Sequence, residues 1–583
     1  MALDRRLVAG GVGAAALGIV VFAACGQMFP GDTAPGAGSQ PATTRSGVVE
    51  KPIEVIVPAV DKATKQISMP AAFWNEKMAD WVETAVCGRP SDFLHETIVC
   101  TTTTKTIMVT KLREAGCVDA DEWVANVADF PRVRGDRLMI LLEVTRTEKG
   151  GSGKVETYPL DELLVYQGWG VSIGPFGWMF KGAPGEPRQK AAANATQPAQ
   201  EQIYRDDPQV ALRIQGIRNV SDSYVDHPLC YDDWIFPAFH YHRNYALLPA
   251  AVYDSNGDVP VKLIMQKVTE AELLQGMAKY WHDPAFAAYI LKQMPLAEQI
   301  DRDKAELWKT LPALHEQEKN AAQVPGKALD VRNTEEFGKV SLLVATIEKE
   351  YAALDAAWVD WSCEHAQWET KEAAEIKELE AERKLWREHI DQKRDGSEQL
   401  WKAEVAGAKL RDLARQPDGP EKKAAGRHAT GAQLAARSRA MLLDNKQVLD
   451  RWKYERDRLT ADDPRAEWRQ HIAAQVGLAE CRQDLGEKGI VLGELMQKDG
   501  TEAEEAVARG AYQKAVVAAT LAGLRVKLAD VEFEIIKRET IENDPDLPEF
   551  KKQRDDIKAQ ISKLEAATRP AGTQPAAMVP MPK

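Results

Sequence analysis

The sequence predicts an α+β fold, in which a mainly antiparallel sheet domain is followed by a long antiparallel α-helical coiled-coil region. Short β-rich apolar runs, separated by turns rich in glycine, aspartate and asparagine, occupy residues 66–265. After about residue 266 the apolar spacing changes from two to about 3.5 residues, which is typical of packed helices. Short breaks separate the long helical segments, and short breaks favour antiparallel neighbours.

Residues 1–25 have the features of a secretory signal that ends at a lipidated cysteine. Arg5 and Arg6 precede an apolar run from Leu7 to Ala24, and small residues stand directly before Cys25. Phe22 departs from this pattern, because leucine is more common at that position. We expect a lipid on Cys25 and a membrane-anchored place in the cell envelope, periplasmic or surface-exposed. An uncleaved N-terminal anchor and a cytosolic protein are the alternatives.

Composition limits the classes of partner and defines a linker. The net charge of −13, without a basic cluster in the later sequence, argues against a nucleic-acid partner. Residues 26–65 are rich in proline, glycine, serine and threonine, so we expect a flexible spacer there. The same reasoning predicts a disordered tail over residues 568–583. No apolar run after the first 25 residues is long enough to span a bilayer.

The sheet domain is expected to contain strands and two helices. The β-rich runs predict strands over residues 97–101, 138–144 and 261–265. Helices are expected over residues 107–115 and 120–129.

The order of several residues in the first half resembles the YdjY-like domain family of uncharacterised bacterial exported proteins. The resemblance covers about residues 66–265 and is carried by Asp92 to Thr97, Gly135-Asp136, Val155 to Pro159 with Leu163, Trp178 to Gly182, and Val210, Gly216, Asn219, Asp226, Pro228 and Pro260-Val261. A polar insertion at about residues 182–203 departs from the family. The resemblance implies domain boundaries and an envelope setting, and it implies no catalytic residue.

The second half predicts short helices followed by long ones. Prolines near positions 284, 295 and 312 predict several short packed helices over residues 266–332. Long coiled-coil helices are expected over residues 333–567. Their predicted starts are a capping box at Asn333 and Glu336, then Thr430, then Thr501 with Glu504, and last a segment near Asp546. The break from Pro417 to Gly426 ends the first long helix, and Asp463-Pro464 predicts a restart or a kink.

Two apolar seams support the coiled-coil interpretation. The first falls at alternating spacings of four and three residues, at Ile347, Tyr351, Leu354, Trp358, Trp361, His365 and Trp368. Its tryptophans favour packing wider than a two-stranded coil. The second has the most regular heptads, at Val517, Leu521, Leu524, Leu528, Val531 and Ile535.

Two clusters are candidate sites. Imidazole and thiolate groups bind transition metals, so a zinc site is one hypothesis for His227, Cys230, His240 and His242, against a structural loop and strand. No other cofactor is expected. Glycines interleaved with aromatic residues could form a stacking surface for a sugar or peptide, with Trp169, Phe176 and Trp178 as ligand-binding candidates, against core packing. His95 and Glu96 near Asp92 are more simply structural than an acid and base.

Seven cysteines agree with an oxidising compartment. Six remain besides Cys25, but their number does not assign a disulfide, and each of the six could equally be a buried thiol. No phosphate loop, nucleophile elbow or zinc-protease motif is present in the sequence. We therefore expect a tethered, non-catalytic binding or scaffold lipoprotein. The alternatives are an exported metal-dependent enzyme and a coiled-coil assembly protein that joins copies of itself or another envelope protein.

Overall fold

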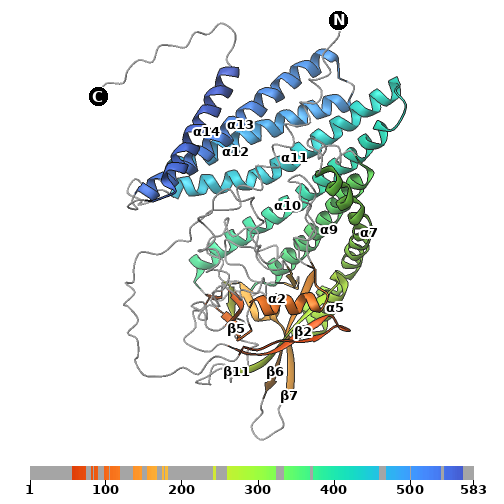
Figure 1. The fold of residues 1–583 in the computed structure, drawn as a ribbon, viewed down its shortest axis with the longest axis vertical. Helices are drawn as coiled ribbons and strands as arrows, with labels where there is room; N and C mark the ends of the chain where they lie inside the picture. The colour runs from red at the N-terminus through yellow and green to blue at the C-terminus, as the bar shows by residue number, and fades with distance from the viewer. Residues whose placement is uncertain are drawn as a thin grey trace. The chain divides into compact units, whose positions relative to one another are not determined.

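The computed structural model describes residues 55–73, 81–82, 84–88, 97–103, 105–118, 136–146, 154–166, 174–175, 177–180, 241–243, 259–322, 334–367, 372–458, 468–498, 500–539 and 544–568. These residues fall into two compact units, with the boundary between residues 390 and 391. We call the described residues up to 390 the sheet unit and those from 391 onward the helical unit. Figure 1 shows the strands of the first and the long helices of the second.

The main sheet is antiparallel except at one edge. Its central path runs in the order β4 (Thr84–Gly88), β5 (Thr97–Thr101), β2 (Gln66–Phe73), β11 (Val259–Val268), β6 (Arg137–Arg146) and β7 (Lys154–Pro159). Strands β1 (Ala59–Asp61) and β9 (Trp178–Met179) add to β2 and β6, and only β4 and β5 pair in parallel among the described strands. The three predicted strands are confirmed as β5, β6 and β11.

Side chains on both faces are buried at the centre of the sheet, including the consecutive Leu263 and Ile264 of β11. In β11, Val261, Leu263 and Met265 are buried, while Lys262 is exposed and its ammonium pairs with Glu143 of β6 at 2.9 Å. A second, three-stranded sheet has the order β3 (Trp81–Val82), β10 (Tyr241–Arg243) and β8 (Leu164–Tyr166).

Helices complete the core of the sheet unit. The predicted helix over 107–115 is confirmed as α2 (Lys105–Glu114), whereas residues 120–129 lie outside the described residues. Then follow α5 (Glu270–Tyr280), α6 (Pro284–Lys292), α7 (Met294–Ala322) and α9 (Glu335–His365). Thr269 and Glu272 form a capping box at α5, and the Asp283 carboxylate caps α6 with Pro284 in its first turn.

Pro312 does not divide the helix, contrary to the prediction. Helix α7 continues through it for 29 residues. A proline inside a helix costs about 3 kcal/mol. Leu307, Leu311 and Leu314 are buried in the same core, and each buried leucine contributes about 1.5–3 kcal/mol, which offsets that cost.

The predicted long helix from Asn333 is wrong in its start and its length. Thr334 is the N-cap, since its hydroxyl accepts from the Phe337 amide, and α9 ends at His365 before α10 (Ala373–Ala414) begins. The His365 ring contacts the Trp361 carbonyl through Nδ1 at 2.8 Å and stacks on the Trp361 indole, so it satisfies a carbonyl at the helix end.

The first predicted seam is mostly buried. Ile347, Tyr351, Leu354 and Trp358 lie in the core of the sheet unit. Trp361 is half-buried, His365 is exposed, and Trp368 lies outside the described residues.

The helical unit consists of successive antiparallel helices, namely the last part of α10, α11 (Pro420–Arg458), α12 (Trp468–Gln497), α13 (Glu502–Glu539) and α14 (Leu547–Thr568). The ion pairs show the direction, since Lys551 pairs with Glu539 while the later Lys558 pairs with the earlier Glu532. The predicted starts of α13 and α14 are confirmed. Helix α11 begins ten residues before the predicted Thr430, because Pro420 fits its first turn.

The second predicted seam is not the most buried face of α13. Five of its six positions are half-buried, and only Ile535 is buried. The deepest positions also include Ala515, Ala522 and Val526. The buried face of α13 therefore combines small side chains with Val526 and Ile535.

Glycines bring α11 and α12 together. A Cβ on Gly493 would lie 2.6 Å from the Gly431 carbonyl oxygen and 2.7 Å from the Ala435 nitrogen. Farther along, the Asn445 side-chain amide donates to the Ala479 carbonyl at 2.7 Å. Both contacts require the two backbones to approach closely.

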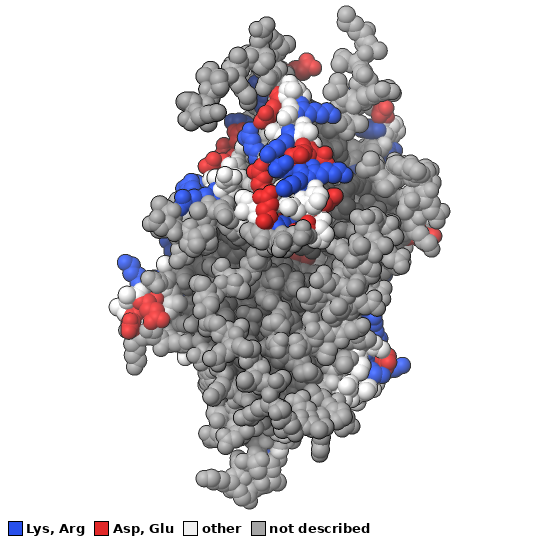
Figure 2. Space-filling view, turned by 60° about the vertical axis from the view of Figure 1, so that its left-hand side comes forward, with Lys and Arg blue, Asp and Glu red and all other residues white. Residues whose placement is uncertain are grey.

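Charged side chains lie on the described surface and also form contacts between the helices. Figure 2 shows acidic and basic side chains intermixed on the described part of one face. Arg427 of α11 also pairs with the half-buried Glu505 of α13 and donates to the Gly500 carbonyl at 2.9 Å. No described helix combines the length and the hydropathy needed to cross a membrane.

Replacing Gly493 by alanine is expected to destabilise the helical unit by about 1–3 kcal/mol, because the new methyl group would overlap the α11 backbone. Gly477→Ala is the matched control in the same helix, since nothing lies within 4 Å of its added Cβ. The control should gain about 0.5–1 kcal/mol from helix propensity. Urea unfolding measures both, and equal stability of the two variants would contradict the close-packing account.

Candidate functional site

The predicted metal ligands lie almost entirely outside the described residues. His227, Cys230 and His240 are not among them, and His242 is placed only as a residue of β10, paired with Val165 and Trp81. Within the described ranges, no group of three or more histidine, cysteine or acidic side chains is placed to hold a metal ion. The zinc site therefore stays a prediction, as does the lipid on Cys25, which also lies outside these ranges.

Of the aromatic candidates, the structure describes only Trp178. Its side chain is 0% exposed in β9, so it presents no open stacking face. The indole Nε1 donates to the Asp161 carboxylate at 3.0 Å. Its position supports the core-packing alternative, while Trp169 and Phe176 lie outside the described residues.

Asp161 is one of two adjacent buried acids in the short helix η3 (Leu160–Leu163), which directly follows β7. Besides the Trp178 indole, its carboxylate accepts the Gly177 amide at 3.1 Å. Gly177 has a φ of 59°, and a Cβ there would lie 2.7 Å from the Leu138 carbonyl oxygen, so the turn requires glycine. Burial raises the pKa of Asp161 to about 7, although these hydrogen bonds and the charge of Arg137 oppose the rise.

The other acid, Glu162, holds a histidine at the turn between α5 and α6. Its carboxylate accepts the His282 backbone amide at 2.6 Å and contacts the His282 ring nitrogen Nδ1 at 2.9 Å. The Glu162 side chain is 2% exposed and that of His282 is 35% exposed. Tyr158 stacks on the imidazole with a centroid separation of 4.3 Å. Burial raises the pKa of Glu162, while its bonds to His282 lower it.

This arrangement is the candidate functional site of the described residues. A carboxylate on Nδ1 fixes the ring orientation and favours the tautomer with the proton on that nitrogen. The other ring nitrogen, Nε2, would then be an acceptor on a side chain that is one-third exposed. A group so placed can accept a hydrogen bond or a proton from a ligand.

A second ionic cluster joins the sheet to three helices. Glu270 at the start of α5 accepts from Arg137 Nε of β6 at 3.0 Å, from Lys304 Nζ of α7 at 2.8 Å and from the Tyr351 hydroxyl of α9. Burial raises the pKa of Glu270, but the charges of Arg137 and Lys304 outweigh it and lower that pKa to about 2. The Asp301 carboxylate accepts the amides of Glu270 and Ala271, which caps α5.

Another buried acid, Glu350 of α9, lies near Asp303 of α7. Burial and the neighbouring carboxylate of Asp303 together raise the pKa of Glu350 to about 7, against the charges of Lys349 and Arg302.

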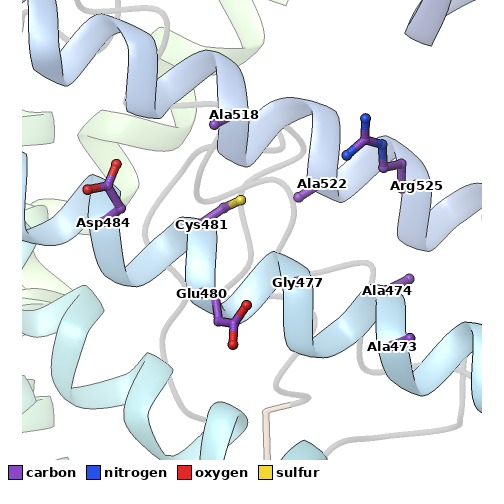
Figure 3. A pocket seen from close by; sticks show the side chains of 9 residues that line it. All are labelled: Ala473, Ala474, Gly477, Glu480, Cys481, Asp484, Ala518, Ala522 and Arg525. Carbon is purple, nitrogen blue, oxygen red and sulfur yellow. The ribbon is translucent and has the colours of Figure 1, made fainter.

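The helical unit contains a hollow between α12 and α13 with a volume of about 430 Å³ (Figure 3). Small side chains form most of its lining, and Glu480, Asp484 and Arg525 stand around them. Arg525 pairs with Glu565 of α14 at 3.1 Å. Cys481 also lines the hollow, and burial raises the pKa of its thiol. These groups supply no set of ligands for a defined chemistry.

Comparisons of the chain with protein-family models, with curated proteins and with solved structures find no match.

The sequence interpretation did not include Asp161, Glu162, His282 or Glu270 as site residues. One signal for the first two was present, since Asp161 and Glu162 stand between Leu160 and Leu163 in an apolar stretch. Their partners are more than ten residues away along the chain, and pairing with His282 spans 120 positions. No local spacing could have revealed that contact.

The change Glu270→Gln is expected to destabilise the sheet unit by about 3–5 kcal/mol, because it leaves Arg137 and Lys304 buried without their counter-charge. Glu306→Gln is the control, since its pair with Lys309 is exposed and contributes at most about 1 kcal/mol. Urea unfolding followed by tryptophan fluorescence measures both. A loss below 1 kcal/mol for Glu270→Gln would show that the cluster does not stabilise the unit.

The pH dependence of the free energy of unfolding should reflect the titration of the Asp161 carboxyl group. Its pKa is higher in the folded chain than the ordinary 3.8, so its stabilisation is complete below about pH 4 and is lost as the pH rises through about 7. The loss is on the order of a few kcal/mol. Asp161→Asn cannot titrate, so its unfolding free energy should fall less steeply over this range, with the parts from Glu162 and Glu350 retained. Parallel profiles for the two proteins would contradict this assignment.

Proposed function

We propose that this chain is a membrane-tethered protein of the bacterial cell envelope, held by a lipid on Cys25, in which the first half binds a ligand or partner and the helices act as a scaffold. The tether follows from the sequence features of residues 1–25 and the spacer over residues 26–65. The proposal includes a YdjY-like domain over residues 66–265.

The observation that carries the scaffold role is the packing of the helical unit. Each helix from α11 to α14 packs against the next one along the chain. The α11–α12 contact is too close for a methyl group at Gly493, and Asn445 donates across it. Such close contacts resist bending, which suits a spacer or a platform for assembly. We propose that these helices form an antiparallel coiled-coil region that can also contact another envelope protein or a second copy.

The binding role of the first half is supported by His282. The imidazole is held by Glu162, stacked by Tyr158 and left one-third exposed. It is suited to accept a hydrogen bond from a polar ligand without any covalent chemistry.

The tether is tested by mass spectrometry of the mature N-terminus and by fractionation of cells. The wild-type protein should begin at a diacylated Cys25 and remain with the membranes after a high-salt wash, because an acyl chain is unaffected by salt. In Cys25→Ser the lipid should be absent.

Cys481→Ser is the matched control, because it removes a cysteine far along the chain and should leave the lipid in place. An unmodified Met1 at the N-terminus of the wild-type protein would contradict the lipoprotein proposal. Unchanged membrane association of Cys25→Ser, without a lipid elsewhere, would favour the uncleaved anchor.

A further inference from the structure

Strands β4 and β5 bring two cysteines into register at one edge of the main sheet. Cys87 and Cys100 are partners in this parallel pair, between the pairs Val86 with Val99 and Gly88 with Thr101. In this structure Cys100 is a buried, reduced thiol, which donates to the Ala72 carbonyl of β2 at 3.5 Å. Thirteen positions separate the two cysteines in the sequence, so only strand pairing aligns them.

The spacing of neighbouring strands suits a disulfide. Adjacent strands lie about 4.7–4.9 Å apart, and the Cα atoms of bridged cysteines lie about 4.4–6.8 Å apart. Residues in register occupy the same face of a sheet, because successive residues alternate between faces. Cys87 and Cys100 therefore hold opposing positions on one face.

We propose that Cys87 and Cys100 form a disulfide bond that fastens β4 to β5. Strand β4 is the outer strand of the central path, and among the described strands it pairs only with β5. The bond would fix the edge and close a loop of about 14 residues, which restricts the unfolded chain.

The reaction is a thiol–disulfide exchange with an oxidised dithiol protein or oxidised glutathione. One cysteine thiolate attacks the disulfide of the oxidant and forms a mixed disulfide, with one thiolate leaving. The second cysteine then attacks the mixed disulfide, forms the Cys87–Cys100 bond and releases the other thiolate. Two cysteine thiols are oxidised and one disulfide of the oxidant is reduced to two thiols.

The occurrence of this bond in the cell rests on the proposed function, because an exported protein meets an oxidising compartment. The capacity to form it rests on the strand register alone. Cys117 follows α2, and Cys363 lies in α9. No strand register in the described part aligns either of them with another cysteine.

Peptide mapping of the purified full-length protein tests the bond directly. The protein is equilibrated with a reduced and oxidised glutathione buffer, blocked with N-ethylmaleimide and cut after glutamate. Cleavage at Glu83 and Glu96 places the two cysteines on different peptides. A linked pair of these peptides is expected, and separation of the pair by reductant should follow. Two alkylated cysteines, or a link from either to another cysteine, would overturn the proposal.

Thermal unfolding with and without reductant supplies a second readout. Reductant should lower the Tm of the oxidised wild-type protein by roughly 5–10 °C, as expected for a loop of this length. Cys87→Ser should show no reductant effect, whereas the control Cys117→Ser should keep it. This difference within each protein does not depend on how a substitution itself changes the Tm. A wild-type Tm that is the same with and without reductant would overturn the proposal.

The two proposals can fail separately. Bond formation in the glutathione buffer, together with an N-terminus that carries no lipid, would support the disulfide and contradict the tether. A lipid on Cys25, together with two alkylated cysteines in the same preparation, would support the tether and contradict the disulfide.

Discussion

The Glu270 carboxylate is the interaction on which the sheet unit depends, because it bonds to groups from three other elements. Arg137 comes from β6, Lys304 from α7 and Tyr351 from α9. Arg137 and Lys304 also lie over the Tyr351 ring, at 5.1 and 5.4 Å from its centroid. These contacts form only where β6, α7 and α9 meet at the start of α5. The cluster therefore fixes how helices that follow the sheet in sequence pack against it.

The second constraint of the sheet unit is the pair of acids in η3. Asp161 fixes a glycine turn and the buried indole of Trp178, while Glu162 reaches the turn before α6 through His282. Both acids have a raised pKa because they are buried. Their carboxylates hold buried groups of the core, yet the Glu162 contact leaves the His282 side chain partly exposed. The candidate for ligand contact among the described residues is therefore held in place by a contact that also stabilises the core.

The helical unit is stabilised differently, by close approach of backbones. Gly431 and Gly493 permit the contact of α11 with α12, and Asn445 bonds across it. Buried alanines in α13 continue this small-residue packing. Apolar periodicity predicted the existence and order of these helices, but it emphasised leucine and valine positions that are only half-buried. Small side chains give a weak periodic signal, although they decide the distance between helices.

The sequence by itself determined the class of elements, three strands, the first helix and the starts of α13 and α14, because alternation, capping residues and prolines act locally. It did not predict the end of α9 at His365, and it could not carry α7 through Pro312, since the burial of leucines in the core decides that point. Only the tertiary structure joined Glu162 to His282, assembled the Glu270 cluster and put Cys87 beside Cys100. Those contacts depend on strand register and on long-range packing, which no local spacing of residues encodes.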